Sequence, residues 1–273
     1  MILAIDIGNT NIVLGCLNSE EDVTFVERLS TDRGRTVLEY AISIKNVLEM
    51  YGVQPEHLEG AIISSVVPPI TSVVRAAVQK ITGHKAMVVG PGLRTGLHIL
   101  MDNPAQVGSD LVVDAVAAIH QHPAPLVVID MGTATTLSVV DKNKNYIGGM
   151  IVPGMRGSLD SLVSRAAQLS NIDLEAPRRL IGKNSAECMK SGMIYGNAAL
   201  LDGLIERIEA ELGQPVTAVA TGGLAKLVVP YCKKEILVDD ALLLKGMLII
   251  YRKNQAVHTE KKESTCPAQA PIA

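Results

Sequence analysis

The sequence predicts an α/β fold made of two similar halves, and three observations lead to this expectation. Apolar runs typical of strands alternate with segments of helical periodicity along the 273 residues. Val, Ile, Leu and Ala carry the hydrophobic content of 48%, which suits parallel strands buried between helices. One motif occurs twice: residues 2–11 and 126–136 are apolar runs that end in Asp-x-Gly, followed by small hydroxyl or amide residues. Each copy predicts a strand, a tight turn and a second strand.

In the first half, a turn at Gly8–Asn11 separates two apolar runs and predicts a hairpin at the start of the chain. A buried strand that starts at Gly60 stops at Pro68-Pro69, and residues 90–109 are too rich in Gly and Pro to be regular. The other elements expected in this half are strands over 2–6, 12–17, 23–29 and 86–89 and helices over 36–51, 70–81 and 110–120.

The second half repeats the strand–turn–strand opening. It then adds a third Gly-rich segment, Ala220–Ala225, after the apolar run 216–219. The other elements expected here are strands over 126–130, 135–140 and 146–152 and helices over 155–168, 191–212 and 241–252. We therefore expect three regions: an N-terminal half over 1–118 with a first phosphate loop, a C-terminal half over 119–253 with a second phosphate loop and the Gly-rich turn, and a disordered polar tail over 254–273.

Composition argues against several functional classes. The net charge is −3, no basic patch favours nucleic acid, and one Phe without any Trp offers no platform for base stacking. The four cysteines are scattered without Cys-x-x-Cys spacing, so they indicate neither a zinc site nor a disulfide framework. No apolar stretch approaches the length of a membrane span, and the first apolar run is too short for a signal peptide. We expect a cytoplasmic protein that binds neither nucleic acid nor membranes.

Asp6 and Asp130 occupy matching places in the two copies of the repeated motif. An aspartate at such a strand end can hold a cation, and the backbone N–H groups of the turn can hold a phosphate. Two units facing each other across a central cleft would make a nucleotide site. One copy alone is also explained by ordinary turn chemistry, because Gly takes positive φ and Asp caps turns. Two copies, each with a cluster of Thr or Asn, favour the nucleotide site.

Seven segments together resemble the type III pantothenate kinase family, in that family's order and over about residues 1–252. The resemblance implies the duplicated actin-like, ribonuclease H-like fold that actin, acetate kinase and the sugar kinases share. The segments are Asp6-Ile-Gly-Asn-Thr-Asn, Ser64-Ser-Val-Val-Pro-Pro, Val89-Gly-Pro-Gly, Asn103-Pro-x-x-Val-Gly-x-Asp110, Asp130-x-Gly-Thr-Ala-Thr-Thr, Gly182-Lys-Asn and Ala220-Thr-Gly-Gly-Leu-Ala.

The resemblance also implies an activity and residue roles. The reaction is phosphorylation of pantothenate by ATP to 4'-phosphopantothenate, the first step of coenzyme A synthesis, by a homodimer that uses magnesium and a monovalent cation, potassium or ammonium. Asp110 matches the general base, Asp130 the ligand of the monovalent cation, Thr133 a nucleotide contact, and Asp6 lies near the magnesium. The first phosphate loop matches Asp6, Ile7, Gly8, Asn9, Thr10, Asn11, Ile12 and Val13, and the substrate contacts match Met101, Gly108, Ser109, Asp110, Leu111 and Ser185.

The chemistry at Asp110 is reasonable without the resemblance. Phosphoryl transfer needs neutralised charge and an aligned hydroxyl more than a strong base. A carboxylate within hydrogen-bond reach can orient that hydroxyl and accept its proton. Because Asp110 follows Gly108-Ser109 at a predicted helix start, the helix dipole should favour its ionised form. On the residues alone, an N-cap aspartate explains the position equally well.

The chain departs from the family pattern mainly on the acceptor side. Leu111 replaces the usual Arg and Met101 a common Tyr, and the exchanges at Asp114, Ser185 and Val152 replace the usual Asn, Thr and Thr. Leucine cannot supply the fixed charged donors of a guanidinium. Three alternatives stay open: a kinase with a changed acceptor, a nucleotide-binding paralogue with a regulatory role and weak catalysis, or rescue by another cation among Arg94, Arg156 and Arg165. A phosphatase or hydrolase on the same fold would keep both Asp-x-Gly turns without needing the segment at Asp110.

Overall fold

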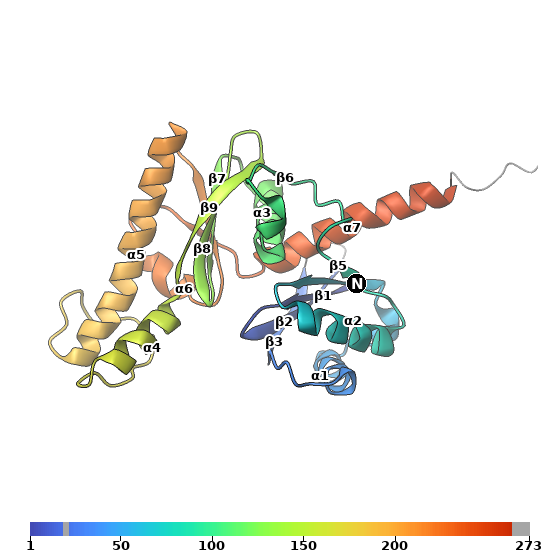
Figure 1. Cartoon of the computed structure of the whole chain (residues 1–273), viewed down its shortest axis with the longest axis horizontal. Coiled ribbons are helices and arrows are strands. Elements are labelled where there is room, and N and C mark those ends of the chain that lie inside the picture. Colours follow the sequence, from blue (N-terminus) through green and yellow to red (C-terminus); the bar gives the residue numbers. More distant parts are fainter. Residues whose placement is uncertain (19–21, 264–273) are drawn as a thin grey trace, which may run out of the picture. The chain divides into compact units, whose positions relative to one another are not determined.

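The computed structural model describes residues 1–18 and 22–263 of the chain. These residues form two compact units, each built on a single β-sheet with helices packed against it (Figure 1). The expected mixed α/β architecture with a duplicated core is therefore confirmed. Within the described residues, no helix is both long enough and apolar enough to cross a membrane.

The boundaries of the two units differ from the expected halves 1–118 and 119–253. The first unit consists of Met1–Gly96, Gly108–Val116 and the C-terminal helix from Leu243, and the second contains Leu97–Val107 and Ala117–Leu242. The last helix, α7 (Leu242–Glu263), belongs almost entirely to the first unit because its side chains pack there, far from their neighbours in sequence. The order of elements along the sequence does not reveal that the last helix packs in the first unit.

The sheet of the first unit has the strand order β3-β2-β1-β4-β5. Its first three strands form an antiparallel meander, whereas β4 and β5 run parallel to β1. The elements of this unit are β1 (Ile2–Ile7), β2 (Asn11–Leu17), β3 (Val23–Ser30), α1 (Val37–Met50), η1 (Pro55–His57), β4 (Gly60–Ser65), α2 (Pro68–Thr82), β5 (Met87–Val88) and the first half of α3 (Ser109–Gln121), together with α7.

Helices cover both faces of this sheet. Leu3, Ile5 and Ile63 point to the face covered by α1 and α2 and share one apolar core with them, and α7 crosses the opposite face (Figure 1). Two glycines allow that crossing: a Cβ atom on Gly15 of β2 would overlap with Leu244, and one on Gly60 of β4 would overlap with the Tyr251 hydroxyl. The same hydroxyl donates a hydrogen bond of 3.2 Å to the carbonyl oxygen of Glu59.

The sheet of the second unit has the order β11-β10-β7-β8-β9-β6. Five of its strands repeat the arrangement of the first sheet, and β6 adds an edge that runs parallel to β9. The elements are β6 (His98–Ile99), η2 (Pro104–Gln106), β7 (Leu126–Met131), β8 (Ala134–Val140), β9 (Asn145–Pro153), α4 (Met155–Arg165), α5 (Ser185–Leu212), β10 (Thr217–Thr221), α6 (Ala225–Val228), η3 (Val229–Tyr231) and β11 (Leu237–Val238).

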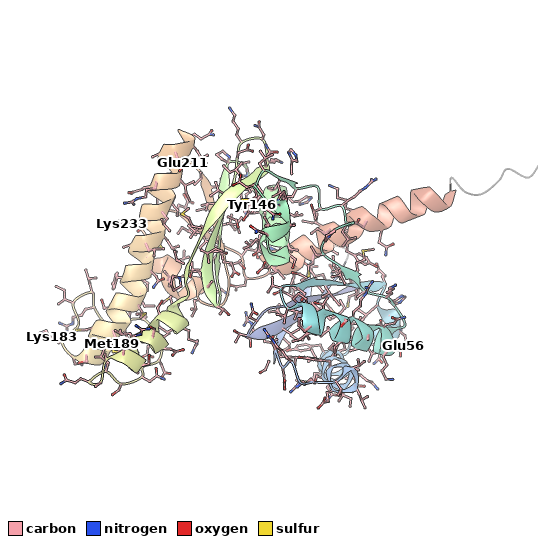
Figure 2. The ribbon with its side chains drawn as sticks, in the orientation of Figure 1. Glu56, Tyr146, Lys183, Met189, Glu211 and Lys233 are labelled. Atoms are coloured by element: carbon pink, nitrogen blue, oxygen red, sulfur yellow. The ribbon has the colours of Figure 1, made fainter. Side chains whose placement is uncertain are left out.

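The long helix α5 covers one face of the second sheet. It runs from near Met189, beside α4, to beyond Glu211 at the other end (Figure 2). Its buried Ile194, Leu201 and Ile205 join an apolar core with Val127 and Ile129 of β7. On β9, the buried Tyr146 places its hydroxyl 3.2 Å from the hydroxyl of Ser138 on β8.

Three expectations need correction. Helix α5 begins at Ser185 instead of residue 191, because Asn184 caps it by accepting a hydrogen bond of 2.9 Å from the Glu187 amide. Within the irregular segment 90–109, His98 and Ile99 form the short strand β6. Helix α7 continues to Glu263, so residues 254–263 are helical instead of disordered, while 264–273 lie outside the described residues.

Candidate active site

The first phosphate loop joins β1 to β2. Asp6 is the fifth residue of the six-residue strand β1, where it pairs with Val13 of β2 and Ser64 of β4. After it, the Gly8 amide donates a hydrogen bond of 3.0 Å to the Asn11 carbonyl and closes the turn. The side chains of Asn9, Thr10 and Asn11 are exposed. The turn thus presents amide and hydroxyl groups next to a carboxylate, which suits phosphate and a bound cation.

Thr31 holds this loop in place, and sequence reasoning missed it. Its hydroxyl donates a hydrogen bond of 2.7 Å to the Gly8 carbonyl, and its amide donates one of 3.0 Å to the Thr10 carbonyl. Two carbonyl oxygens therefore point towards Thr31 instead of towards an incoming phosphate. The strand register offers the missing signal, because Ser30 pairs with Asn11 and the next residue must lie beside the turn.

Ser109 fastens the start of α3 to the end of β4. Its Oγ lies 3.1 Å from the Oγ of the fully buried Ser64, accepts a hydrogen bond of 2.9 Å from the Ser65 amide, and lies 3.1 Å from the Ser65 carbonyl oxygen. The Ser109 hydroxyl is thus engaged with β4 inside its own unit. Because β1 and β4 are adjacent and parallel, their C-terminal ends lie side by side. The contact of Ser109 with the end of β4 therefore brings Asp110 to the same end of the sheet as Asp6.

Asp110 is the second residue of α3, not its N-cap, because the helix begins at Ser109. One carboxylate oxygen accepts a hydrogen bond of 2.9 Å from the Leu111 amide, so the side chain does satisfy one free amide of the first turn. Gly108 makes room for this conformation, since a Cβ atom there would overlap with the same oxygen. Burial raises the pKa of the Asp110 carboxyl, and hydrogen bonds from the Leu111 and Asp110 amides partly offset the rise.

The second unit repeats the turn at Asp130. Asp130 is again the fifth residue of a six-residue strand, β7, with the same sequence of buried and half-buried positions as β1. The Gly132 amide donates a hydrogen bond of 3.0 Å to the Ala134 carbonyl, and the Thr133 side chain is exposed. Asp130 pairs with Thr221 of β10 as Asp6 pairs with Ser64 of β4.

Two glycines enclose this second turn. Gly222, just after β10, has φ of +90°, and a Cβ atom there would overlap with an Asp130 carboxylate oxygen and come 2.6 Å from the Met131 amide nitrogen. A Cβ atom on Gly154, the N-cap of α4, would overlap with the Thr133 carbonyl oxygen. The expected Gly-rich turn therefore lies against the Asp130 loop, and it leads into the short helix α6.

The residues expected to contact the acceptor are divided between the units. Gly108, Ser109, Asp110 and the half-buried Leu111 belong to the first unit. Met101 belongs to the second unit and packs beside Gly148, where an added Cβ atom would lie 3.8 Å from its Sδ atom. Ser185, also in the second unit, is exposed at the first position of α5, just after the loop that carries Lys183 (Figure 2).

Comparison with known proteins decides the family. The family model described as type III pantothenate kinase matches residues 2–207. This chain belongs to the type III pantothenate kinase family. The match includes both Asp-x-Gly turns, the segment around Asp110 and Ser185. As a member of this kinase family, the protein is expected to act on a small molecule.

Solved structures of low sequence identity share the fold of this pantothenate kinase family member. A protein described as a Baf family transcriptional activator from Campylobacter jejuni has 20% identity and a TM-score of 0.57, with 93% of this chain and 99% of that one covered. The activator of 2-hydroxyisocaproyl-CoA dehydratase from Clostridium difficile, solved with bound ADPNP, has 14% identity, a TM-score of 0.54 and coverage of 100% and 99%. A protein described as a 2-dehydro-3-deoxygalactonokinase from Sinorhizobium meliloti has 12% identity, a TM-score of 0.55 and coverage of 100% and 99%. These relatives support the expected actin-like fold of ATPases and sugar kinases.

Proposed function

We propose that this protein transfers the γ-phosphoryl group of ATP to the hydroxyl of pantothenate, giving 4'-phosphopantothenate and ADP. The family match supports the substrate pair. The observation that carries the proposal is the built environment of Asp110: a half-buried carboxylate on a helix start that Ser109 fixes to the sheet edge next to the first phosphate loop. A general base for a hydroxyl needs this combination of fixed position and raised pKa.

In this reaction the two turns and Asp110 have different roles. The turns after Asp6 and Asp130 bind the phosphates of ATP, with exposed Asn9, Thr10 and Thr133 as contacts. Asp110 accepts a hydrogen bond from the pantothenate hydroxyl, orients it and takes its proton. As the hydroxyl oxygen forms its bond to the γ-phosphorus, the bond from that phosphorus to the bridging oxygen of ADP breaks.

The two repeated carboxylates suit cations. Asp6 would hold magnesium, which neutralises phosphate charge when bound, and Asp130 would hold potassium or ammonium beside the second turn. Gly222 packs so closely against the Asp130 carboxylate that a Cβ atom on this glycine would overlap with it. Assays in potassium, ammonium and sodium buffers test the cation: we expect activity in the first two only, and equal activity in sodium would contradict the role of Asp130.

The apolar Leu111 next to Asp110 favours one second candidate, a nucleotide-binding paralogue with another acceptor or a regulatory role. The two functions are separated by measuring ATP binding and product formation with the same purified protein. Binding of ATP with formation of 4'-phosphopantothenate supports the kinase. Binding of ATP without that product supports the paralogue.

We further propose that the protein works as a cytoplasmic homodimer, as the family match suggests. Sedimentation equilibrium tests the assembly directly. A mass twice the 29.0 kDa of one chain is expected, and a monomer at assay concentrations would contradict it.

A further inference from the structure

A groove in the first unit lies between α2 and the edge strand β5, and neither phosphate loop contributes to it. Its volume is about 480 Å³, within the range of small-molecule sites. Pro68, Ala76 and Val88 give it an apolar wall, and Ser65, Thr71 and Ser72 line it with hydroxyl groups.

Two cations line the same groove. The Arg75 side chain is anchored by a hydrogen bond of 3.2 Å from Nε to the Ala86 carbonyl, and Lys85 is the residue immediately before Ala86. Arg75 is thus anchored by the backbone, whereas Lys85 is an exposed cation that lines the same groove. An anion in the groove would be attracted by both positive charges.

No acidic side chain balances these charges in the groove. None of the described residues that line it is Asp or Glu, and within residues 1–18 and 22–263 neither Arg75 nor Lys85 forms an ion pair. A guanidinium fixed by its Nε still has terminal N–H groups in the fork geometry that matches phosphate or carboxylate.

We infer that this groove binds a small organic oxyanion, a phosphate or carboxylate group on an apolar body, with Arg75 and Lys85 on the charged group. The apolar wall accounts for the body, and the exposed hydroxyl of Ser72 can make a further polar contact, whereas the Thr71 hydroxyl already donates a hydrogen bond of 2.7 Å to Ser65 Oγ. Ser65 lines the groove, and its amide donates to the Ser109 hydroxyl oxygen, so the ligand would lie close to the segment that supports Asp110. The inference stands apart from the proposed kinase activity, because it needs no residue of the phosphate loops.

Calorimetric titration of the full-length protein tests the site with two probes that carry the same butyl chain, monobutyl phosphate and pentanoate. Arg75→Gln and Lys85→Gln remove one cation each, and Lys80→Gln is the matched control, since Lys80 is an exposed cation of α2 outside the groove. Lys85 forms no ion pair with any residue that the structure describes, so its exchange tests the site even if Arg75→Gln impairs folding.

We expect wild type and Lys80→Gln to bind at least one probe equally, and Arg75→Gln and Lys85→Gln to bind it about tenfold or more weakly, as the loss of a charge-assisted hydrogen bond predicts. The stronger probe identifies the head group as phosphate or carboxylate. Equal affinity in all four proteins, or no binding by wild type, would overturn the inference. Kinase activity without probe should be unchanged in all four, so a failed kinase assay and a failed titration remain distinguishable.

Discussion

The hydroxyl oxygen of Ser109 lies 3.1 Å from that of Ser64, and the same Ser109 oxygen accepts a hydrogen bond from the next residue of β4. One side chain therefore joins the first turn of α3 to the end of a central strand. Because Asp110 follows directly, the position of the proposed base depends on a hydroxyl that is hydrogen-bonded to β4.

Ser109→Ala is expected to lower kcat for pantothenate phosphorylation about tenfold while leaving the KM for ATP nearly unchanged. The variant leaves the Ser65 amide without its acceptor, which should also reduce the free energy of unfolding by about 1–2 kcal/mol. Steady-state kinetics and urea unfolding measure the two effects. Ser72→Ala, which removes an exposed hydroxyl from α2, is the matched control and should change neither.

A purely structural role for Ser109 would leave the pH profile of the remaining activity unchanged. If Ser109 positions Asp110, the acidic limb of that profile should move in Ser109→Ala and return in Ser109→Thr, which keeps the hydroxyl. An unchanged profile in both variants would contradict a positioning role.

The raised pKa of Asp110 predicts how activity and stability depend on pH. Activity should fall on acidification at a higher pH than an ordinary aspartate would give, because the base must be ionised. Stability depends on pH in the opposite direction. The folded protein holds the Asp110 proton more tightly than the unfolded chain does, so the free energy of unfolding decreases as pH rises from the pKa of the unfolded state to that of the folded state.

Asp110→Asn should therefore inactivate the enzyme while raising its melting temperature at neutral pH. Thermal unfolding at pH 7 and below pH 4 tests this, with the difference from wild type expected to shrink at the lower pH. A variant that is less stable than wild type at neutral pH would show that the ionised carboxylate stabilises the fold.

The repeat at Asp6 and Asp130 could be predicted from sequence, because its signal is local: an apolar strand, Asp-x-Gly and small polar residues. The return of α7 to the first unit could not, because it depends on distant partners such as Gly15 and Gly60 that merely lack a side chain. The role of Ser109 was likewise hidden. The segment resembles a substrate loop, and only the hydrogen bonds of Ser109 to Ser64 and Ser65, which are distant in sequence, reveal that its hydroxyl faces the protein.

Gly222→Ala is expected to weaken ATP binding about tenfold or more. The residue has φ of +90°, and a Cβ atom would press on the Asp130 carboxylate, so the second turn must move. Gly223→Ala is the matched control one residue away, because a Cβ atom there would meet no atom within 4 Å. Fluorescent nucleotide titration compares the two variants, and equal affinities would show that the Gly222 turn is not part of the nucleotide site.

Leu111→Arg combined with Met101→Tyr is expected to raise kcat/KM for pantothenate by roughly 10- to 150-fold, the value of one charge-assisted hydrogen bond. The gain should appear in the constants for pantothenate and not in those for ATP, because we propose that both positions contact the acceptor. Kinetics of the double variant and of each single variant measure it. A wild type that already equals the double variant would show that another residue does the work of the missing Arg.

Product formation by the purified wild-type protein tests the central claim most directly. With ATP, magnesium, potassium and pantothenate, mass spectrometry should detect 4'-phosphopantothenate in equal amount to ADP, and Asp110→Asn should form it about 10²–10⁴-fold more slowly while still binding ATP. Wild-type protein that binds ATP but forms no phosphopantothenate would contradict the account, and so would an Asp110→Asn variant with near-normal turnover.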